Sequence, residues 1–384
     1  IRQMYEENKR DEEEVKRVTA SSDRGESYYN DGKTPGNEKI NNSRLAFYKE
    51  VAYRDQKTSG FLMPYPHGVV IKQGERNHYY RGENQIFDKS QPTLLRRLTQ
   101  FDNDEERMLY RIIAYMRISE FKSFLSKFNI VKNWEYGDVL FEPLAQHYGL
   151  ETDWLDITND FNVALFFATC YWDSKENRWL PLRREQTERN EKTQYGVIFH
   201  ARAFNVLVNL SAAYAPPHIR EDLKANGILP IGFQPFMRCQ SQYAYGIKML
   251  KPFPLQDDIM FEKLYFRHSE ELSQKVYELM EQGNKIYPKE GLNEFQDIID
   301  QIRTATIFSE ESFTEACAML NIKELLHYKE LLGKMGIQIV NDCHPYNLSR
   351  QRLRAMNRKY YNFSLEKNFG IKIHYRPTKR GKIS

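Results

Sequence analysis

The sequence of 384 residues is poor in cysteine, and its four cysteines stand far apart with no Cys-x-x-Cys pair. They are Cys170, Cys239, Cys317 and Cys343. This spacing argues against a disulfide framework and against a zinc site, so we expect no metal. A long hydrophobic run is also missing, because "VALFFATCYW" falls short of the roughly 20 apolar residues that span a bilayer. The mean hydropathy is -0.71, and no signal-peptide pattern stands at the start of the sequence. We therefore predict a cytoplasmic protein with reduced thiols, and we expect no membrane partner.

The excess of positive over negative charge is small, since the net charge of the whole chain is only +4. The distribution is uneven, because residues 349–384 contain eleven lysines and arginines against one glutamate, a local charge of +10. Tyrosines and phenylalanines alternate with these cations. Cations neutralise phosphates and aromatic rings stack on bases, so this basic tail predicts contact with RNA or DNA. A solvated extension that packs on the rest of the protein is the alternative.

The chain divides into three regions by composition. We predict a charged N-terminal extension with a flexible connector at 1–60, one domain at 61–300, and a helical and basic C-terminal extension at 301–384. Helical and strand patterns are mixed without regular alternation, which is typical of the α+β class. The patterns predict strands at 67–74, 78–85 and 240–250, and helices at 105–128 and about 162–172.

A crowd of polar residues stands directly before the most apolar run, in "LAQHYGLETDWLDITNDFNVALFFA" at 144–168. Thr158 or Asn159 is predicted as the N-cap of the helix that follows. Helix capping would also direct hydroxyls, carboxylates and backbone N–H groups toward one cleft, where an anionic ligand binds. Capping alone is the alternative interpretation of these residues.

Four short segments follow one another along the chain and form a set of motifs: "YYRGENQ" at 79–85, "QPTLLRRL" at 91–98, the block at 144–168, and "RCQSQYAYGIKM" at 238–249. The set resembles the FRG-domain family, named for an aromatic-Arg-Gly motif, and "KIYPKEGLNEF" at 285–295 is similar to its closing segment. The motif order of FRG domains is similar to that of ADP-ribosyltransferases, and some relatives look like toxins of bacterial defence systems. The resemblance therefore implies an ADP-ribosyltransferase-like split β core with flanking helices.

The same resemblance implies roles for single residues. In the ADP-ribosyltransferase superfamily an Arg lies on the first core strand, a Ser or Thr precedes a helix under the nicotinamide pocket, and a Glu or Gln on a later strand contacts the ribose. Carried over, catalytic roles fall on Arg81, Asp156, Thr158 and Gln242. Binding of NAD, as substrate, falls on Tyr80, Arg81, Gly82, Arg96, His147, Tyr148 and Thr152.

The chemistry of NAD cleavage fits these residue types. Arg81 can bind the pyrophosphate with both arms of its guanidinium, and Gly82 leaves room for close backbone approach. The transition state is oxocarbenium-like, so an acceptor group near the ribose stabilises it. Asp156 meets this need by charge, whereas Gln242 meets it only by hydrogen bonding. Along a predicted strand, Gln242 would share one face with Arg238 and Gln240.

One departure from the family pattern concerns charge. Relatives commonly read Thr-Arg-Leu-Leu-Asp-Trp-Thr where this chain reads "TDWLDIT", so Asp153 replaces an arginine. We expect Asp153 to bring a negative charge into the pocket, which would alter the ligand or leave the site inactive.

The resemblance implies an NAD-dependent ADP-ribosyltransferase that acts as a toxin or defence effector, with RNA or DNA as a candidate acceptor and an antitoxin as a candidate partner. Two alternatives stay open. The first is an RNA-cleaving or RNA-binding toxin without NAD chemistry; for RNA cleavage, His147 would act with His200 or His218 as acid and base. The second is a non-catalytic module that senses a ligand.

Overall fold

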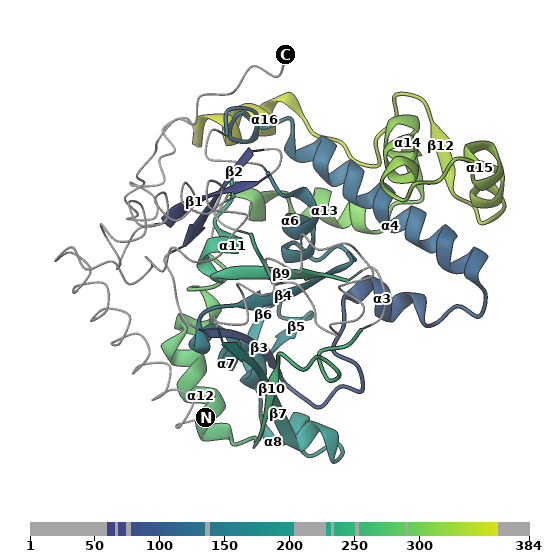
Figure 1. Ribbon diagram of the computed structural model, residues 1–384. Coiled ribbons are helices and arrows are strands. Elements are labelled where there is room, and N and C mark those ends of the chain that lie inside the picture. Colours follow the sequence, from purple (N-terminus) through teal and green to yellow (C-terminus); the bar gives the residue numbers. More distant parts are fainter. Residues whose placement is uncertain are drawn as a thin grey trace, which may run out of the picture.

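A computed structural model describes residues 60–65, 68–73, 78–134, 139–202, 228–231, 234–249, 253–288 and 291–359 (Figure 1). The predicted N-terminal extension lies outside the described residues, apart from its last residue. The basic tail lies outside them from residue 360 onward. Helices and strands are mixed in the described part, which confirms the α+β class.

A six-stranded antiparallel sheet forms the centre of the molecule, in the strand order β10-β7-β3-β4-β9-β8. The strands are β3 (His78–Glu83), β4 (Trp154–Thr158), β7 (Tyr195–Arg202), β8 (Ile228–Pro230), β9 (Ala244–Lys248) and β10 (Glu262–Arg267). Between β3 and β4 the register contains a single pair, Tyr80 opposite Thr158. These two strands therefore run together over only a short length, and this junction borders the candidate site.

Helices cover both faces of the sheet. On one face α7 (Phe161–Thr169) packs against β3 and β7, and α12 (Glu270–Leu279) packs on α7. On the other face α3 (Thr93–Leu98) and α4 (Asp104–Leu125) bury their leucines and isoleucines against β4, β7 and β9. Neighbouring side chains of β3 divide accordingly, because Tyr79 belongs to the core under α4 and Tyr80 to the core around α7.

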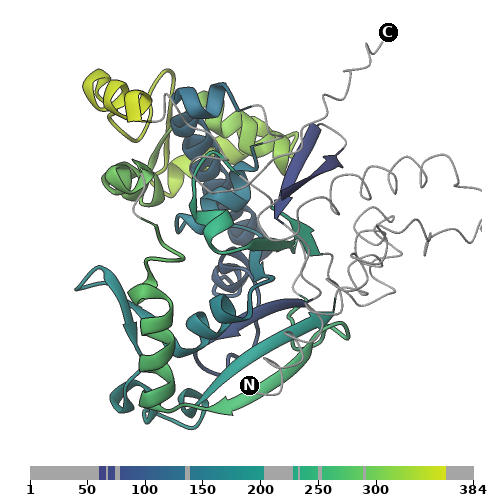
Figure 2. The same cartoon turned by 90° about the vertical axis from the view of Figure 1, so that its left-hand side faces the viewer.

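The C-terminal helices and strands lie around the long helix α4. These elements are α13 (Gln296–Arg303), β11 (Ile307–Ser309), α14 (Glu310–Met319), α15 (Leu325–Lys334), β12 (Gln338–Val340) and α16 (Arg350–Lys359). They lie at the top of the molecule in both views (Figures 1 and 2), whereas α8 (Arg184–Thr187) lies at the bottom of Figure 1. The carboxylate of Glu120, fully buried in α4, accepts hydrogen bonds from Ser309 N at 3.0 Å and Ser309 Oγ at 2.7 Å. Its other oxygen lies 2.8 Å from His344 Nδ1.

The remaining elements are short. They are β1 (Gly60–Tyr65), β2 (Gly68–Gln73), α5 (Asn129–Lys132), α6 (Phe141–His147), β5 (Cys170–Asp173), β6 (Arg178–Pro181), α8 (Arg184–Thr187), η1 (Lys192–Gln194), α11 (Arg238–Ser241), η2 (Glu281–Gly283) and η3 (Gly291–Phe295). β1 pairs with β2, and β5 with β6, as antiparallel hairpins. Within the described residues no helix is long and apolar enough to cross a membrane.

Several predicted elements are confirmed and others are wrong at their ends. The helix predicted at 105–128 is α4, which Asn103 caps by accepting from Glu106 N. The helix predicted at 162–172 ends at Thr169, because the residues after it form β5. Its N-cap is Asp160, which accepts from two backbone N–H groups, rather than Thr158 or Asn159. The strand predicted at 240–250 begins only at Ala244, so the face expected for Arg238, Gln240 and Gln242 does not exist.

Candidate functional site

A pocket of about 290 Å³ lies between β3, β4, α7 and the β5–β6 hairpin. Most of the residues predicted for the site line it: Tyr80, Arg81, Gly82, Arg96, His147, Asp156, Thr158 and Gln242. The structure thus brings together side chains from β3, α3, α6, β4 and the turn before β9, which are far apart in the sequence. Tyr148 and Thr152 are not among the lining residues.

Two hydrogen bonds hold the side chain of Arg81 at the β3–β4 junction. Its Nε donates to Glu83 Oε1 at 2.9 Å, and its Nη1 donates to the backbone oxygen of Asp156 at 2.9 Å. Glu83 is buried and also accepts from Ser90 Oγ at 2.6 Å, so the carboxylate is fixed as well. The side chain of Arg81 remains 21% exposed, and its Nη2 has no hydrogen bond to the described residues. One arm of a rigidly oriented guanidinium is therefore free to bind an anion.

Arg96 adds a second cation to this wall. It lies in the last turn of α3 and lines the same pocket. Partial burial and the nearby charge of Arg81 both lower the pKa of Arg96, while Glu83 opposes them. An arginine stays protonated at neutral pH despite such a change. Two guanidinium groups therefore face one region of the pocket, with the carboxylate of Glu83 already bonded to one of them.

Gly82 is required for the packing of α7 on β3. A Cβ atom at this position would lie 1.7 Å from the backbone oxygen of Ala164 and 3.0 Å from the backbone nitrogen of Ala168. The backbone of α7 therefore packs directly on the backbone of β3. Packing of α7 on β3 thus requires this glycine, which also lines the pocket.

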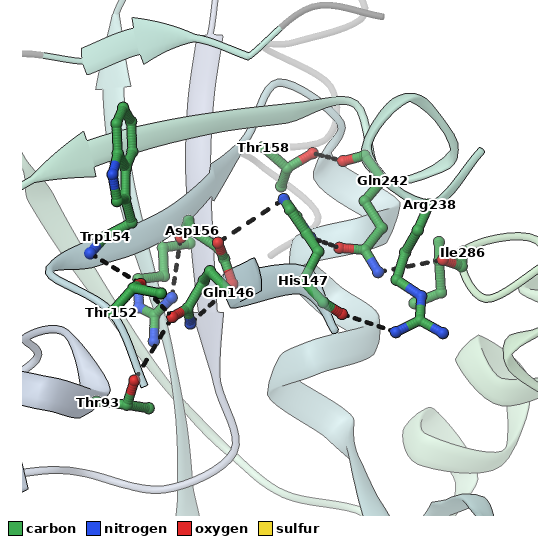
Figure 3. Close-up of polar contacts among 11 residues, drawn as sticks. Thr93, Gln146, His147, Thr152, Trp154, Asp156, Thr158, Arg238, Gln242 and Ile286 are labelled. Atoms are coloured by element: carbon green, nitrogen blue, oxygen red, sulfur yellow. Dashed lines mark hydrogen bonds and ion pairs between the residues drawn. The ribbon is translucent and has the colours of Figure 1, made fainter. Parts of the chain in front are cut away.

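His147 and Asp156 face each other across the pocket, as Figure 3 shows. His147 Nε2 lies 3.8 Å from Asp156 Oδ1. Burial lowers the pKa of His147 and Arg238 lowers it further, although Asp156 and the hydrogen bond to Gln242 act in the opposite direction. The imidazole is therefore neutral at pH 7. The side chain of Asp156 is 36% exposed and brings a carboxylate into the pocket.

Gln242 contacts His147 and the backbone. Its Oε1 lies 2.9 Å from His147 Nδ1, and its Nε2 donates to the oxygen of Ile286 at 3.1 Å (Figure 3). Gln242 is only 5% exposed. Both ends of its amide are therefore used inside the protein, and Gln242 orients the imidazole.

Thr158 is also committed to internal bonds. Its Oγ1 donates to the backbone oxygen of Gln242 at 2.8 Å and accepts from Asp160 N at 3.0 Å. It therefore joins the end of β4 to the turn before β9 and to the start of α7.

A polar network behind the pocket orients Asp156. Gln146 Nε2 lies 3.4 Å from Asp156 Oδ2, and Gln146 Oε1 accepts from Thr152 Oγ1 at 2.7 Å (Figure 3). Thr152 is fully buried and so acts on the pocket only through Gln146. Tyr148 lies under the guanidinium of Arg238, whose carbon is 4.1 Å from the ring centroid, in the core beside α6.

Asp153 does not enter the pocket, contrary to the expectation from the sequence. Its Oδ2 accepts from Arg111 Nη1 at 2.9 Å and from Tyr115 Oη at 2.8 Å, both on α4. Side chains alternate between the two faces of a strand, so Asp153 and Asp156 point to opposite sides of the sheet. Burial raises the pKa of Asp153, and Arg111 counteracts this.

An aromatic wall on the β5–β6 hairpin was missed in the sequence. Trp172 and Trp179 are register partners there, and both line the pocket. Their ring centroids lie 5.7 Å apart, and Tyr287 contacts both rings. Trp172 is 46% exposed. The available signal was the pair of tryptophans on either side of the polar turn "DSKEN".

The histidines proposed for RNA cleavage do not all meet in this pocket. His200 is not a lining residue. It is buried on β7, where its Nε2 lies 2.6 Å from His78 Nδ1 and its ring stacks on Tyr80. His218 lies outside the described residues. In the parts of the chain that the structure describes, no three His, Cys, Asp or Glu side chains are grouped so as to hold a metal ion.

The fold and the pocket define an α+β protein with an arginine-lined site at a strand junction. Residues 76–177 match the FRG domain family, and the match is limited to this part of the chain. No curated protein and no solved structure matches the chain. The match covers β3, β4 and α7, while Gln242 and Trp179 complete the pocket from outside it.

Proposed function

We propose that this protein is an ADP-ribosyltransferase that uses NAD as its substrate and acts as a toxin or defence effector. One observation carries the proposal: Arg81, Thr158 and Gln242 line one pocket. Arg81 lies on the first strand of the central sheet and Thr158 ends the strand before α7. For Arg81 and Thr158 these are the positions that the resemblance to ADP-ribosyltransferases implies, whereas Gln242 lies in the turn before β9 and not on a strand.

The side chains of the pocket suit the parts of NAD. The guanidinium groups of Arg81 and Arg96 are proposed to bind the pyrophosphate, which is an anion that matches their planar forks. The carboxylate of Asp156 would stabilise the positive charge that develops on the ribose. The rings of Trp172 and Trp179 offer a stacking surface for an aromatic ring of the ligand.

The size of the pocket limits which part of NAD is enclosed. Ligand pockets usually measure about 300–1,000 Å³, so 290 Å³ is at the lower end of this range. We propose that the pocket encloses the nicotinamide and its ribose, and that the rest of the dinucleotide extends along Arg96. Gln242 has both ends of its amide engaged, so its proposed role is to position His147.

The test is incubation of the full chain with radiolabelled NAD and cell lysate, or with purified RNA, while released nicotinamide is measured. We expect nicotinamide release and transfer of label by the wild-type chain, and loss of both in Arg96→Ala. The matched control is Arg97→Ala, because Arg97 is exposed on the same helix and donates to Gln100 away from the pocket. Absence of nicotinamide release by the wild-type chain would refute the proposal. Retained NAD binding in that case would favour the ligand-sensing module.

RNA or DNA is the proposed partner, and α16 supplies the described part of the contact surface. Arg350, Arg354 and Arg358 are exposed and spaced four apart, so they share one face of the helix. None of them forms an ion pair with the described residues. Arg352 instead anchors the helix, because it donates to both carboxylate oxygens of Asp297 at 2.8 Å.

A gel-shift assay with single-stranded RNA at several salt concentrations tests this contact. Changing Arg350, Arg354 and Arg358 to Gln should weaken binding and reduce the slope of log K against log salt by about two, at roughly 0.7 per phosphate contact. The control changes three exposed lysines elsewhere, Lys175, Lys323 and Lys334, to Gln and removes the same charge. Equal loss of binding in both triple variants would refute a specific role for α16.

A further inference from the structure

The hydrogen bonds of Gln242 fix the tautomer of His147. Gln242 Nε2 must donate to the oxygen of Ile286, which only accepts. Gln242 Oε1 is therefore the end that faces His147 Nδ1, and it also only accepts. The proton of the neutral imidazole consequently resides on Nδ1, and Nε2 carries a lone pair.

This lone pair lies in the pocket without a partner. His147 Nε2 is sealed from solvent and has no hydrogen bond to the described residues. Asp156 Oδ1, which is also an acceptor, lies 3.8 Å from it. Two acceptors at this separation repel each other unless a donor hydrogen lies between them. The site is therefore built to receive an O–H or N–H group.

We infer that His147, oriented by Gln242 and paired with Asp156, is the base that removes the proton from the acceptor of ADP-ribose. The inference rests on the proposed function and deepens it, because it restricts the acceptor to a group with a removable O–H or N–H proton. The hydroxyls, amides and base N–H groups of proteins and nucleic acids belong to this class.

The proposed step balances in protons and electrons. The acceptor atom forms a bond to the ribose carbon that holds nicotinamide, and the carbon–nitrogen bond to nicotinamide breaks. The bonding electron pair leaves with nicotinamide, which departs neutral. The acceptor proton moves to His147 Nε2, and the resulting imidazolium later releases it to water by way of the carboxylate of Asp156, which is 36% exposed. Asp156, at 3.8 Å, and the side-chain oxygen Oε1 of Gln242 stabilise the imidazolium in the meantime.

The charged groups around the imidazole allow a test with opposite signs. Asp156 on β4 raises the pKa of His147, whereas Arg238 on α11 lowers it. Arg81 on β3 lines the same pocket, and Tyr287 lies beside Gln242. Burial raises the pKa of Tyr287 to about 12, so this phenol stays neutral near pH 7. The two groups to change are therefore Asp156 and Arg238.

The experiment measures two quantities on the full chain. The pKa of His147 is obtained by NMR titration of isotope-labelled histidines, with His147→Gln to assign the signal. The acid limb of the pH profile is obtained from label transfer with NAD and the acceptor. Asp156→Asn should lower both values by about one pH unit, since an opposite charge has been removed nearby. Arg238→Met should raise both. Arg238→Lys keeps the charge and should leave both near their wild-type positions.

The outcomes separate the inference from the proposed function. Parallel movement of the NMR value and the acid limb, with opposite signs in the two variants, supports the base role. An acid limb that stays fixed while the NMR value moves overturns it, and so does an NMR value that neither variant moves. Asp156→Asn alone decides the matter if Arg238→Met fails to fold, because Asp156 lies on the pocket surface. Without nicotinamide release by the wild-type chain, the proposed function is refuted and the inference falls with it.

Discussion

Replacement of Arg81 by Gln tests the anion-binding role of the pocket. Nε and Nη1 of Arg81 are occupied by Glu83 and by the backbone of Asp156, so Nη2 is the arm available to a phosphate. A hydrogen bond that involves a charged group contributes about 1.5–3 kcal/mol. At 1.36 kcal/mol per factor of ten, its loss should weaken NAD binding roughly 10- to 150-fold.

The same substitution disturbs the fold, and this effect has to be separated from binding. Glu83 is buried, and in Arg81→Gln it keeps only the hydrogen bond from Ser90. An uncompensated buried carboxylate is unfavourable, so the single variant should also lose stability. The double variant Arg81→Gln with Glu83→Gln removes the unpaired charge. It should regain stability, while NAD binding stays weak.

The assay is isothermal titration of NAD into the wild-type chain and both variants, beside urea denaturation of each. Arg97→Gln is the control, because Arg97 is exposed and lies outside the pocket. NAD affinity of the double variant within twofold of the wild-type value would refute a phosphate-binding role for Arg81.

Three further predictions concern stability and stacking. Gly82→Ala should destabilise the protein by about 3 kcal/mol or more, because its Cβ would meet the backbone oxygen of Ala164 at 1.7 Å. In Gly246→Ala the clash is with the side chain of Trp154, which can move, so urea denaturation should show a smaller loss; equal losses would contradict the reasoning. Arg111→Met should cost about 3–5 kcal/mol at pH 7, because it leaves the buried carboxylate of Asp153 without its cation. Burial already raises the folded-state pKa of Asp153, and loss of Arg111 raises it further, so Asp153 protonates more readily in the folded chain. Unfolding as a function of pH should show the penalty at neutral pH and a smaller one in acid, and a penalty independent of pH would exclude this cause. Trp172→Ala should weaken NAD binding by about 1–3 kcal/mol with little loss of stability, because Trp172 is 46% exposed. Tyr265→Ala, at an equally exposed aromatic on β10, should leave NAD binding unchanged.

The long helix α4 and the first core strand β3 are clearly predicted by the sequence. α4 has apolar residues at helical spacing, an Asn103 cap and three acidic residues in its first turn, so local and tertiary preferences agree. The end of α7 could not be predicted in this way. The run "VALFFATCYW" is apolar throughout, and periodicity cannot separate a buried helix from a buried strand in such a run. The helix gives way to a strand at Cys170 because the residues from Cys170 onward pair with β6, which lies in a segment with a polar pattern.

The pocket residues were predictable in part, and the error over Asp153 has a local cause. The pattern of "TDWLDIT" predicts a polar approach to a helix, which would direct its side chains to one cleft. It is largely the strand β4, whose alternation sends Asp156 and Thr158 to the pocket and Asp153 to α4. The strand is buried on both faces, so its apolar and polar residues do not alternate in the simple pattern that identifies a strand.

The identity of residue 242 follows from its two neighbours. His147 Nδ1–H needs an acceptor and the oxygen of Ile286 needs a donor, and an amide supplies both. A glutamate here would direct a carboxylate oxygen at a carbonyl oxygen, which is unfavourable unless the acid is protonated. The glutamine is thus explained by local hydrogen bonding. Under the proposed NAD chemistry, a negative charge for the developing cation would then come from another strand. Asp156 on β4 is the carboxylate in the pocket that forms no ion pair with an arginine or lysine among the described residues.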